Sequence, residues 1–116
     1  MVQITLQVTE QLAQQLKPMG DWLSTILELS LIRFKTPAVQ TASEIIDFLA
    51  SNPTSDDLLN FHVSDRAQER LQRLLAINQA GLASPEEQAE LDEISQIEHV
   101  VIMLKAQAHA KDFTRN

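Results

Sequence analysis

The sequence predicts a mainly helical protein with one N-terminal β-strand, short helices and a C-terminal antiparallel helical hairpin. Only two glycines and four prolines interrupt 116 residues, and Leu, Ala, Gln and Glu, which lose little side-chain entropy in a helix, are abundant. Residues 2–8 alternate between apolar and polar side chains, which is the period of a half-buried strand. Ser84-Pro85-Glu86-Glu87 combines an N-cap, a first-turn proline and a third-position glutamate, and therefore marks the start of a long helix.

The expected strand has two different faces. Its apolar face consists of Val2, Ile4, Leu6 and Val8. Its polar face consists of Gln3, Thr5 and Gln7. A lone strand leaves its backbone donors and acceptors unpaired, and no later segment offers a partner. We therefore expect a homodimer in which the apolar face forms the interface, although the pattern does not decide whether the strand pairs within or between chains.

Two helices are expected to complete a dimerisation module over residues 1–36. Thr9 fits the N-cap of a short helix that ends near Lys17. Residues 22–35 carry apolar side chains over most of a helix circumference, from Trp22 to Phe34. This segment is predicted to be the core helix, buried on more than one side.

Short helices and a connector are expected over residues 37–63. Thr41 with Glu44, and Thr54 with Asp57, each have the spacing of a capping box. Asn52-Pro53 separates the two predicted helices.

Residues 64–110 are predicted to form a helical hairpin. Ser64 begins its first helix and Gly81 is placed to end it in a left-handed conformation. The second helix should run from Ser84 to about Ala110, and its apolar seam is suited to an antiparallel neighbour. Residues 111–116 carry no periodic apolar pattern and are expected to fray.

Composition limits the function classes. The 44% hydrophobic and 22% charged residues predict a folded chain, and its length excludes two independent enzymatic domains. The absence of cysteine excludes disulfides and thiolate metal sites. A net charge of −7 repels phosphate backbones, so any nucleic-acid contact must be local. No basic leader or run of about 20 apolar residues is present, so we expect a cytoplasmic protein without membrane contact.

Chemistry-bearing residues favour binding over catalysis. His62, His99 and His109 lack the spacing of a metal site, so no metal, cofactor or catalytic residue is predicted. A small enzyme with a histidine–carboxylate site is the distant alternative, which clustering of the three histidines would revive. Arg66, Arg70 and Arg73 lie along one side of a helix, where they either pair with nearby acids or recognise an acidic partner or nucleic acid.

The opening Ile4-Thr5-Leu6-Gln7-Val8, a short helix, the Gly20 turn and the apolar helix to Phe34 resemble the ribbon-helix-helix proteins. The resemblance implies that strands of two chains form a ribbon whose polar residues, here Gln3, Thr5 and Gln7, enter the DNA major groove. Asp21 departs from the family, because it places negative charge where the phosphate is expected. From Thr41 onwards the chain is similar to small uncharacterised bacterial proteins, notably cyanobacterial ones, that are regarded as antitoxin candidates.

The resemblance implies an antitoxin-like regulator that binds operator DNA through its N-terminal strand and a protein partner through its C-terminal half. The partner would be a basic protein, such as a toxic nuclease, attracted by an acidic helical surface. The expected partner-binding residues are Glu86, Glu87, Glu90, Glu93, Ile94, Ile97, Val101 and Leu104. A helical adaptor or assembly protein that does not bind DNA is the alternative.

Overall fold

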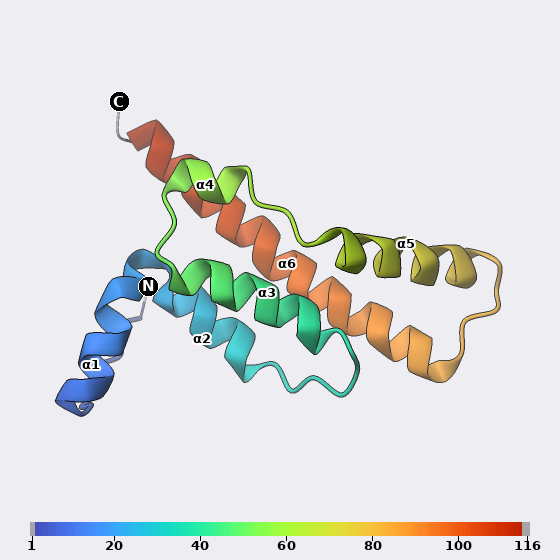
Figure 1. Cartoon of the computed structure of the whole chain (residues 1–116), viewed down its shortest axis with the longest axis horizontal. Helices are drawn as coiled ribbons and strands as arrows, with labels where there is room; N and C mark the ends of the chain where they lie inside the picture. The colour runs from blue at the N-terminus through green and yellow to red at the C-terminus, as the bar shows by residue number, and fades with distance from the viewer. Residues whose placement is uncertain (1, 115–116) are drawn as a thin grey trace.

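The structure is a computed structural model that describes residues 2–114, with side chains described up to Ala110. Helices make up the described part of the chain, as the composition predicts (Figure 1). In chain order they are α1 (Glu10–Leu16), the 3-10 helix η1 (Lys17–Trp22), α2 (Leu23–Leu31), α3 (Val39–Ala50), α4 (Ser55–Leu59), α5 (Asp65–Gln79) and α6 (Pro85–Thr114).

The predicted N-terminal strand is absent, so this part of the expected fold class is wrong. Residues 2–8 belong to no helix or strand, and no β-structure occurs between residues 2 and 114. The described chain holds no second extended segment that could pair with them, and every one of these residues is exposed. Alternation of apolar and polar side chains therefore does not produce a strand here, because a strand also needs a hydrogen-bonding neighbour.

The next two helices follow the predicted order but not the predicted burial. The Thr9 hydroxyl caps α1 by accepting a hydrogen bond from the Leu12 backbone N–H at 3.1 Å. Trp22 is buried, and its indole N–H donates to the Pro53 carbonyl at 2.8 Å. Helix α2 ends at Leu31 and buries one face, while Leu27 lies exposed on the other. The prediction of a helix to residue 35, buried on several sides, is wrong.

Helix α3 begins earlier than the sequence predicts. Its first residue is Val39, so Thr41 lies inside the helix and forms no capping box with Glu44. Instead, the Glu44 carboxylate accepts hydrogen bonds from the backbone N–H and the hydroxyl of Ser64, both at 2.8 Å. This contact fixes the start of α5 against α3.

Four other predicted helix ends are confirmed. Thr54 and Asp57 form a reciprocal capping box at the start of α4, and the Ser64 hydroxyl caps α5. Gly81 has a φ of 73° and ends α5, where the Leu82 N–H donates to the Ile77 carbonyl in a Schellman arrangement. A second capping box starts α6: the Ser84 N–H donates to Glu87, and the Glu87 N–H donates to the Ser84 hydroxyl.

Helix α6 is the spine of the molecule. Helices α2 and α4 pack on α6, α3 packs against α2 and η1, and α5 runs back beside the first part of α6 (Figure 1). Figure 1 also shows α1 projecting from the end of the molecule near the start of α2. The largest fully buried side chains are Leu29, Ile45, Leu49, Leu58 and Leu74. They come from α2, α3, α4 and α5, so a single core joins these helices through α6.

The predicted frayed tail is partly helical. Helix α6 continues to Thr114, beyond the expected end at Ala110, while residues 115–116 lie outside the described part of the chain. Although α6 is long, no helix among the described residues is apolar enough over a sufficient length to cross a membrane.

Candidate functional site

Half of the acidic surface expected on α6 is internal. Glu90 is 3% exposed and Glu93 is 9% exposed. Only Glu86 is fully on the surface among the four predicted partner-binding glutamates, and Glu87 is half-buried because it caps α6. Two of the four carboxylates are thus removed from any contact with a basic partner.

The Glu93 carboxylate holds the loop between α2 and α3 against α6. It accepts hydrogen bonds from the Lys35 N–H at 2.9 Å, the Thr36 N–H at 3.2 Å and the Thr36 hydroxyl at 2.6 Å. Burial alone would raise the pKa of Glu93, but the hydrogen bonds to Thr36 and Lys35 outweigh it and lower the pKa below its ordinary value. The role of Glu93 is therefore to anchor a loop.

The apolar residues of the predicted partner surface belong to the core. Ile94, Ile97 and Leu104 are buried, and Val101 is half-buried against the same cluster. The seam was correctly located on α6, but its residues belong to the same core cluster as buried residues of α2, α3, α4 and α5. The three buried side chains are therefore used inside the chain, whereas Val101 stays partly accessible.

The predicted DNA-binding and dimer-interface residues all lie in the exposed segment 2–8. Gln3, Thr5 and Gln7 are exposed, as the DNA-binding prediction requires, but no ribbon orients them toward a groove. The apolar set is also exposed: Val2, Ile4, Leu6 and Val8 are 88%, 82%, 68% and 40% accessible. Both predictions concern contacts with another molecule. Within the single chain, no part of the described fold covers the apolar set.

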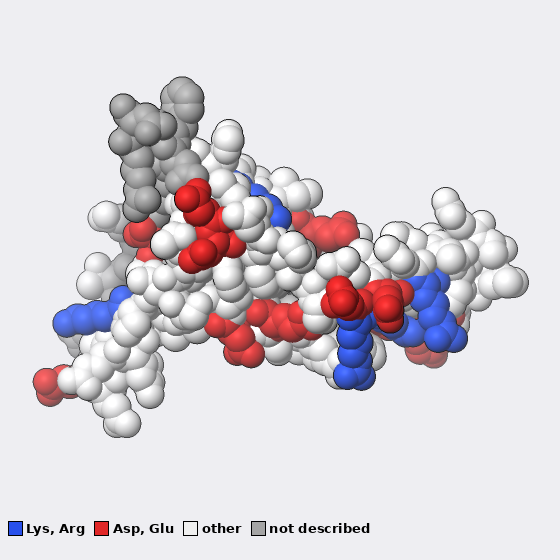
Figure 2. All heavy atoms as spheres, turned by 45° about the horizontal axis from the view of Figure 1, so that its top comes forward, with Lys and Arg blue, Asp and Glu red and all other residues white. Residues whose placement is uncertain are grey.

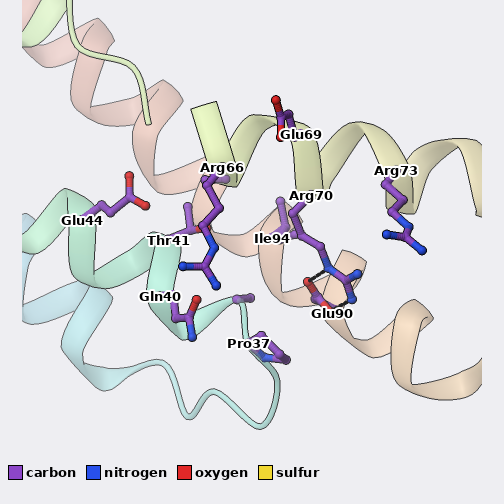
Figure 3. A pocket seen from close by; sticks show the side chains of 12 residues that line it. Pro37, Gln40, Thr41, Glu44, Arg66, Glu69, Arg70, Arg73, Glu90 and Ile94 are labelled. Atoms are coloured by element: carbon purple, nitrogen blue, oxygen red, sulfur yellow. Dashed lines mark hydrogen bonds and ion pairs between the residues drawn. The ribbon is translucent and has the colours of Figure 1, made fainter. Parts of the chain in front are cut away.

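A cleft between α3 and α5 brings together the three arginines that the sequence places on one side of a helix. The cleft has a volume of about 550 Å³, and α6 forms its floor. Arg66, Arg70 and Arg73 line it from α5, while Gln40 and Thr41 line it from α3 (Figure 3). We call this hollow the arginine cleft.

Arg70 is the fixed member of the three. Its guanidinium makes a two-pronged contact with Glu90, with Nε and Nη2 donating to the carboxylate at 3.0 and 2.8 Å. This hydrogen-bonded partner raises the pKa of Arg70 above its ordinary value. Because the Glu90 side chain is buried and that of Arg70 is 44% exposed, the pair neutralises an internal acid and presents the back of the guanidinium to the cleft.

Arg66 and Arg73 flank this pair and form no ion pair with any residue of the described chain. Figure 3 shows the Arg66 side chain reaching across the cleft toward Gln40 and Thr41. Glu69 points away from the cleft in the same view, and Glu44 is occupied by Ser64. The two guanidinium groups are thus the charged donors of the cleft that make no hydrogen bond or ion pair within the described chain, although the charge of Arg73 adds to the hydrogen bonds from Ser84 in lowering the pKa of Glu87.

The arginine cleft differs in charge from the rest of the surface. Figure 2 shows Lys and Arg side chains gathered over the region of α5, whereas Asp and Glu are spread over much of the same face. The chain carries 16 acidic against 9 basic residues, so a face that offers unpaired arginines departs from its overall charge. Sequence spacing indicated the shared side of α5 but not the opposing wall from α3.

The histidines do not assemble into a site. His62 and His99 line two different hollows, one beside the segment 61–63 and the other between α2 and α6. His109 is exposed on the last turns of α6 whose side chains are described. No group of three or more His, Asp or Glu side chains in the described residues is arranged to hold a metal ion.

The chain was also compared with known proteins. No model of a protein family matches it, and neither the curated proteins nor the solved structures contain a match.

Proposed function

We propose that the chain is a helical adaptor that binds an acidic segment of another protein in the arginine cleft. The observation that carries this proposal is the pair of unpaired guanidinium groups, Arg66 and Arg73, on the wall of a cleft of about 550 Å³. A guanidinium presents a planar fork of donors that matches a carboxylate, and its weak hydration makes pairing favourable at an interface.

The spacing of the two arginines favours a protein ligand. Arg66 and Arg73 are seven residues apart on one helix, which corresponds to a rise of roughly 10 Å. Two carboxylates seven residues apart on an acidic helix, and thus about two turns apart, have the same separation.

The composition of the cleft argues against a nucleotide or nucleic acid. The whole chain is acidic, so a ligand of dense negative charge meets repulsion. None of the lining residues is aromatic, so no side chain is placed to stack on a base. Separate carboxylates, each facing one guanidinium, fit better.

This proposal corresponds to the adaptor interpretation and reverses the charge of the expected partner. An antitoxin-like inhibitor of a basic nuclease needs an acidic surface on α6, but Glu90 and Glu93 are occupied inside the chain. The free charge of the cleft is positive, and its complement is an acidic partner.

Fluorescence anisotropy with labelled poly-L-glutamate at low ionic strength tests the proposal. Replacing Arg66 and Arg73 together by Gln should weaken binding at least about tenfold, which is about 1.4 kcal/mol, and added salt should weaken wild-type binding. The matched control is the double variant Lys17→Gln/Arg33→Gln, which removes the same charge from exposed positions outside the cleft. An equal loss in both variants would mean that diffuse charge is responsible, and no wild-type binding would refute the proposal.

A further inference from the structure

The described chain exposes more surface than a compact monomer of its size. Its accessible area is 8610 Å² for 13.0 kDa, whereas about 6300 Å² is expected for a folded monomer of that mass. Part of the excess comes from the N-terminal arm, which we define as residues 2–8. Its apolar side chains Val2, Ile4 and Leu6 are each more than two-thirds exposed. Contiguous exposed apolar surface of this kind marks a binding surface.

A second apolar surface lies on the other side of the core from α2. A groove of about 310 Å³ runs along α6 from Ile94 to Lys105, between the segment 61–63, α3 and the start of α5. We call it the apolar groove. Its apolar walls are Ile45, Phe61, Val63, Leu71, Val101 and Ile102. Ile102 is 65% exposed, so this wall is not covered by any part of the described chain.

We propose that the N-terminal arm of one copy docks in the apolar groove of a second copy, and that two copies exchange arms reciprocally. The two lengths agree. The groove extends along α6 from Ile94 to Lys105, a rise of roughly 16 Å, and an extended chain from Ile4 to Val8 spans roughly 13 Å. The arm needs no main-chain pairing in this arrangement, because its side chains make the contact.

The alternating sequence of the arm suits this role. When Ile4, Leu6 and Val8 point into the groove from an extended segment, the polar residues between them point to water. The groove has a matching polar rim, because His62 and Glu98 are exposed at its edge. Lys105 is held at one end, where its ammonium donates to the Phe61 carbonyl at 3.0 Å, which keeps that end of the groove in shape.

The area buried is that of a stable dimer. Burial of a Val, Leu or Ile side chain removes roughly 60–120 Å² from water. Two arms of three such side chains, together with the groove surfaces they cover, therefore bury roughly 700–1400 Å², which reaches the roughly 1200–2000 Å² of specific protein interfaces. Each copy offers one arm and one groove, so reciprocal exchange closes the assembly at two copies.

Sedimentation equilibrium over a concentration series tests the exchange. The wild type should form a dimer, and Ile4→Asp in the arm and Ile102→Asp in the groove should each raise the dimer Kd at least about a hundredfold, because the new carboxylate would be buried without a partner. Leu31→Asp is the matched control, since Leu31 is 78% exposed but belongs to neither surface. Circular dichroism should show that all three variants remain folded, since each replaced side chain is largely exposed.

A mixing experiment separates reciprocal exchange from other dimers. Ile4→Asp copies retain an intact groove and Ile102→Asp copies retain an intact arm, so the mixture recovers one of the two contacts. The mixed dimer should be tighter than the dimer of either variant alone. A monomeric wild type, a dimer insensitive to Ile102→Asp, or a mixture with no gain would each overturn the proposal.

Discussion

The body of the molecule and its N-terminal arm carry equally clear apolar patterns with opposite outcomes. In the body, Ile94, Ile97 and Leu104 of α6 repeat at helical spacing and all three are buried. In the arm, Ile4 and Leu6 repeat at a spacing of two and both are exposed. A periodic pattern thus identifies the side that can be buried, but the burial itself depends on a neighbour that the pattern does not specify. Substitutions in the body should therefore lower the free energy of unfolding much more than changes in the arm.

The largest effect is expected in the body. Leu49 of α3 is 0% exposed, and Leu49→Ala should lower the free energy of unfolding by about 2–5 kcal/mol through lost burial and the cavity left behind. Chemical denaturation monitored by circular dichroism measures the loss. Leu31→Ala, which truncates an exposed leucine, should change stability by less than about 0.5 kcal/mol. Similar losses at the two positions would contradict the described core.

A smaller loss of stability is expected at Glu93, whose hydrogen bonds hold the loop between α2 and α3 against α6. Glu93→Gln replaces an acceptor of three hydrogen bonds by an amide whose NH₂ faces the donors of Lys35 and Thr36. Unfolding should become easier by about 1–3 kcal/mol. Glu98→Gln makes the same chemical change at an exposed position of α6 and should have little effect. If the two variants were equally stable, the loop would not depend on the carboxylate.

The same carboxylate gives the body a pH dependence. The folded-state pKa of Glu93 lies below its ordinary value of 4.5, so its contribution to stability is complete above pH 4.5 and is lost as pH falls through the folded-state pKa. The stability difference between wild type and Glu93→Gln should therefore shrink at acid pH. Denaturation midpoints at a series of pH values measure this, and a difference that grows toward low pH would contradict the sign of the shift.

Local signals explain what the sequence predicted well. Thr54 with Asp57, and Ser84 with Glu87, form their capping boxes because the partners are three residues apart and need no other part of the chain. Glu44 has the same spacing from Thr41, yet it binds Ser64, twenty residues away. Side chains that satisfy distant backbone groups leave no periodic trace in the sequence.

In the candidate site, too, the local features were predictable from the sequence and the long-range contacts were not. The common side of α5 that carries Arg66, Arg70 and Arg73 follows from helical spacing alone. The cleft requires the packing of α3 opposite α5, and the choice of Arg70 as the paired member depends on Glu90 reaching it from α6. Two residues of the predicted acidic surface are unavailable for the same reason, because Glu90 and Glu93 are used inside the chain by partners far away in sequence.

A local cap should contribute less than a core side chain. Thr54→Ala removes the hydroxyl that accepts from the Asp57 N–H at 3.1 Å, and should lower stability by about 1 kcal/mol. Thr54→Ser keeps the acceptor and is the control. If both variants lost the same stability, the methyl group rather than the cap would be responsible.

The smallest effect on the folded monomer is expected from removing the arm altogether. Deletion of residues 2–8 leaves the Thr9 cap of α1 in place and removes only exposed side chains, so the free energy of unfolding should change by less than about 0.5 kcal/mol in dilute solution. At higher protein concentration the two proteins should diverge, because association of the folded state stabilises it by mass action. The wild-type melting temperature should rise with concentration while that of the shortened chain stays constant. A large loss of stability in dilute solution would instead place the arm within the body, and the contrast between the two regions would no longer hold.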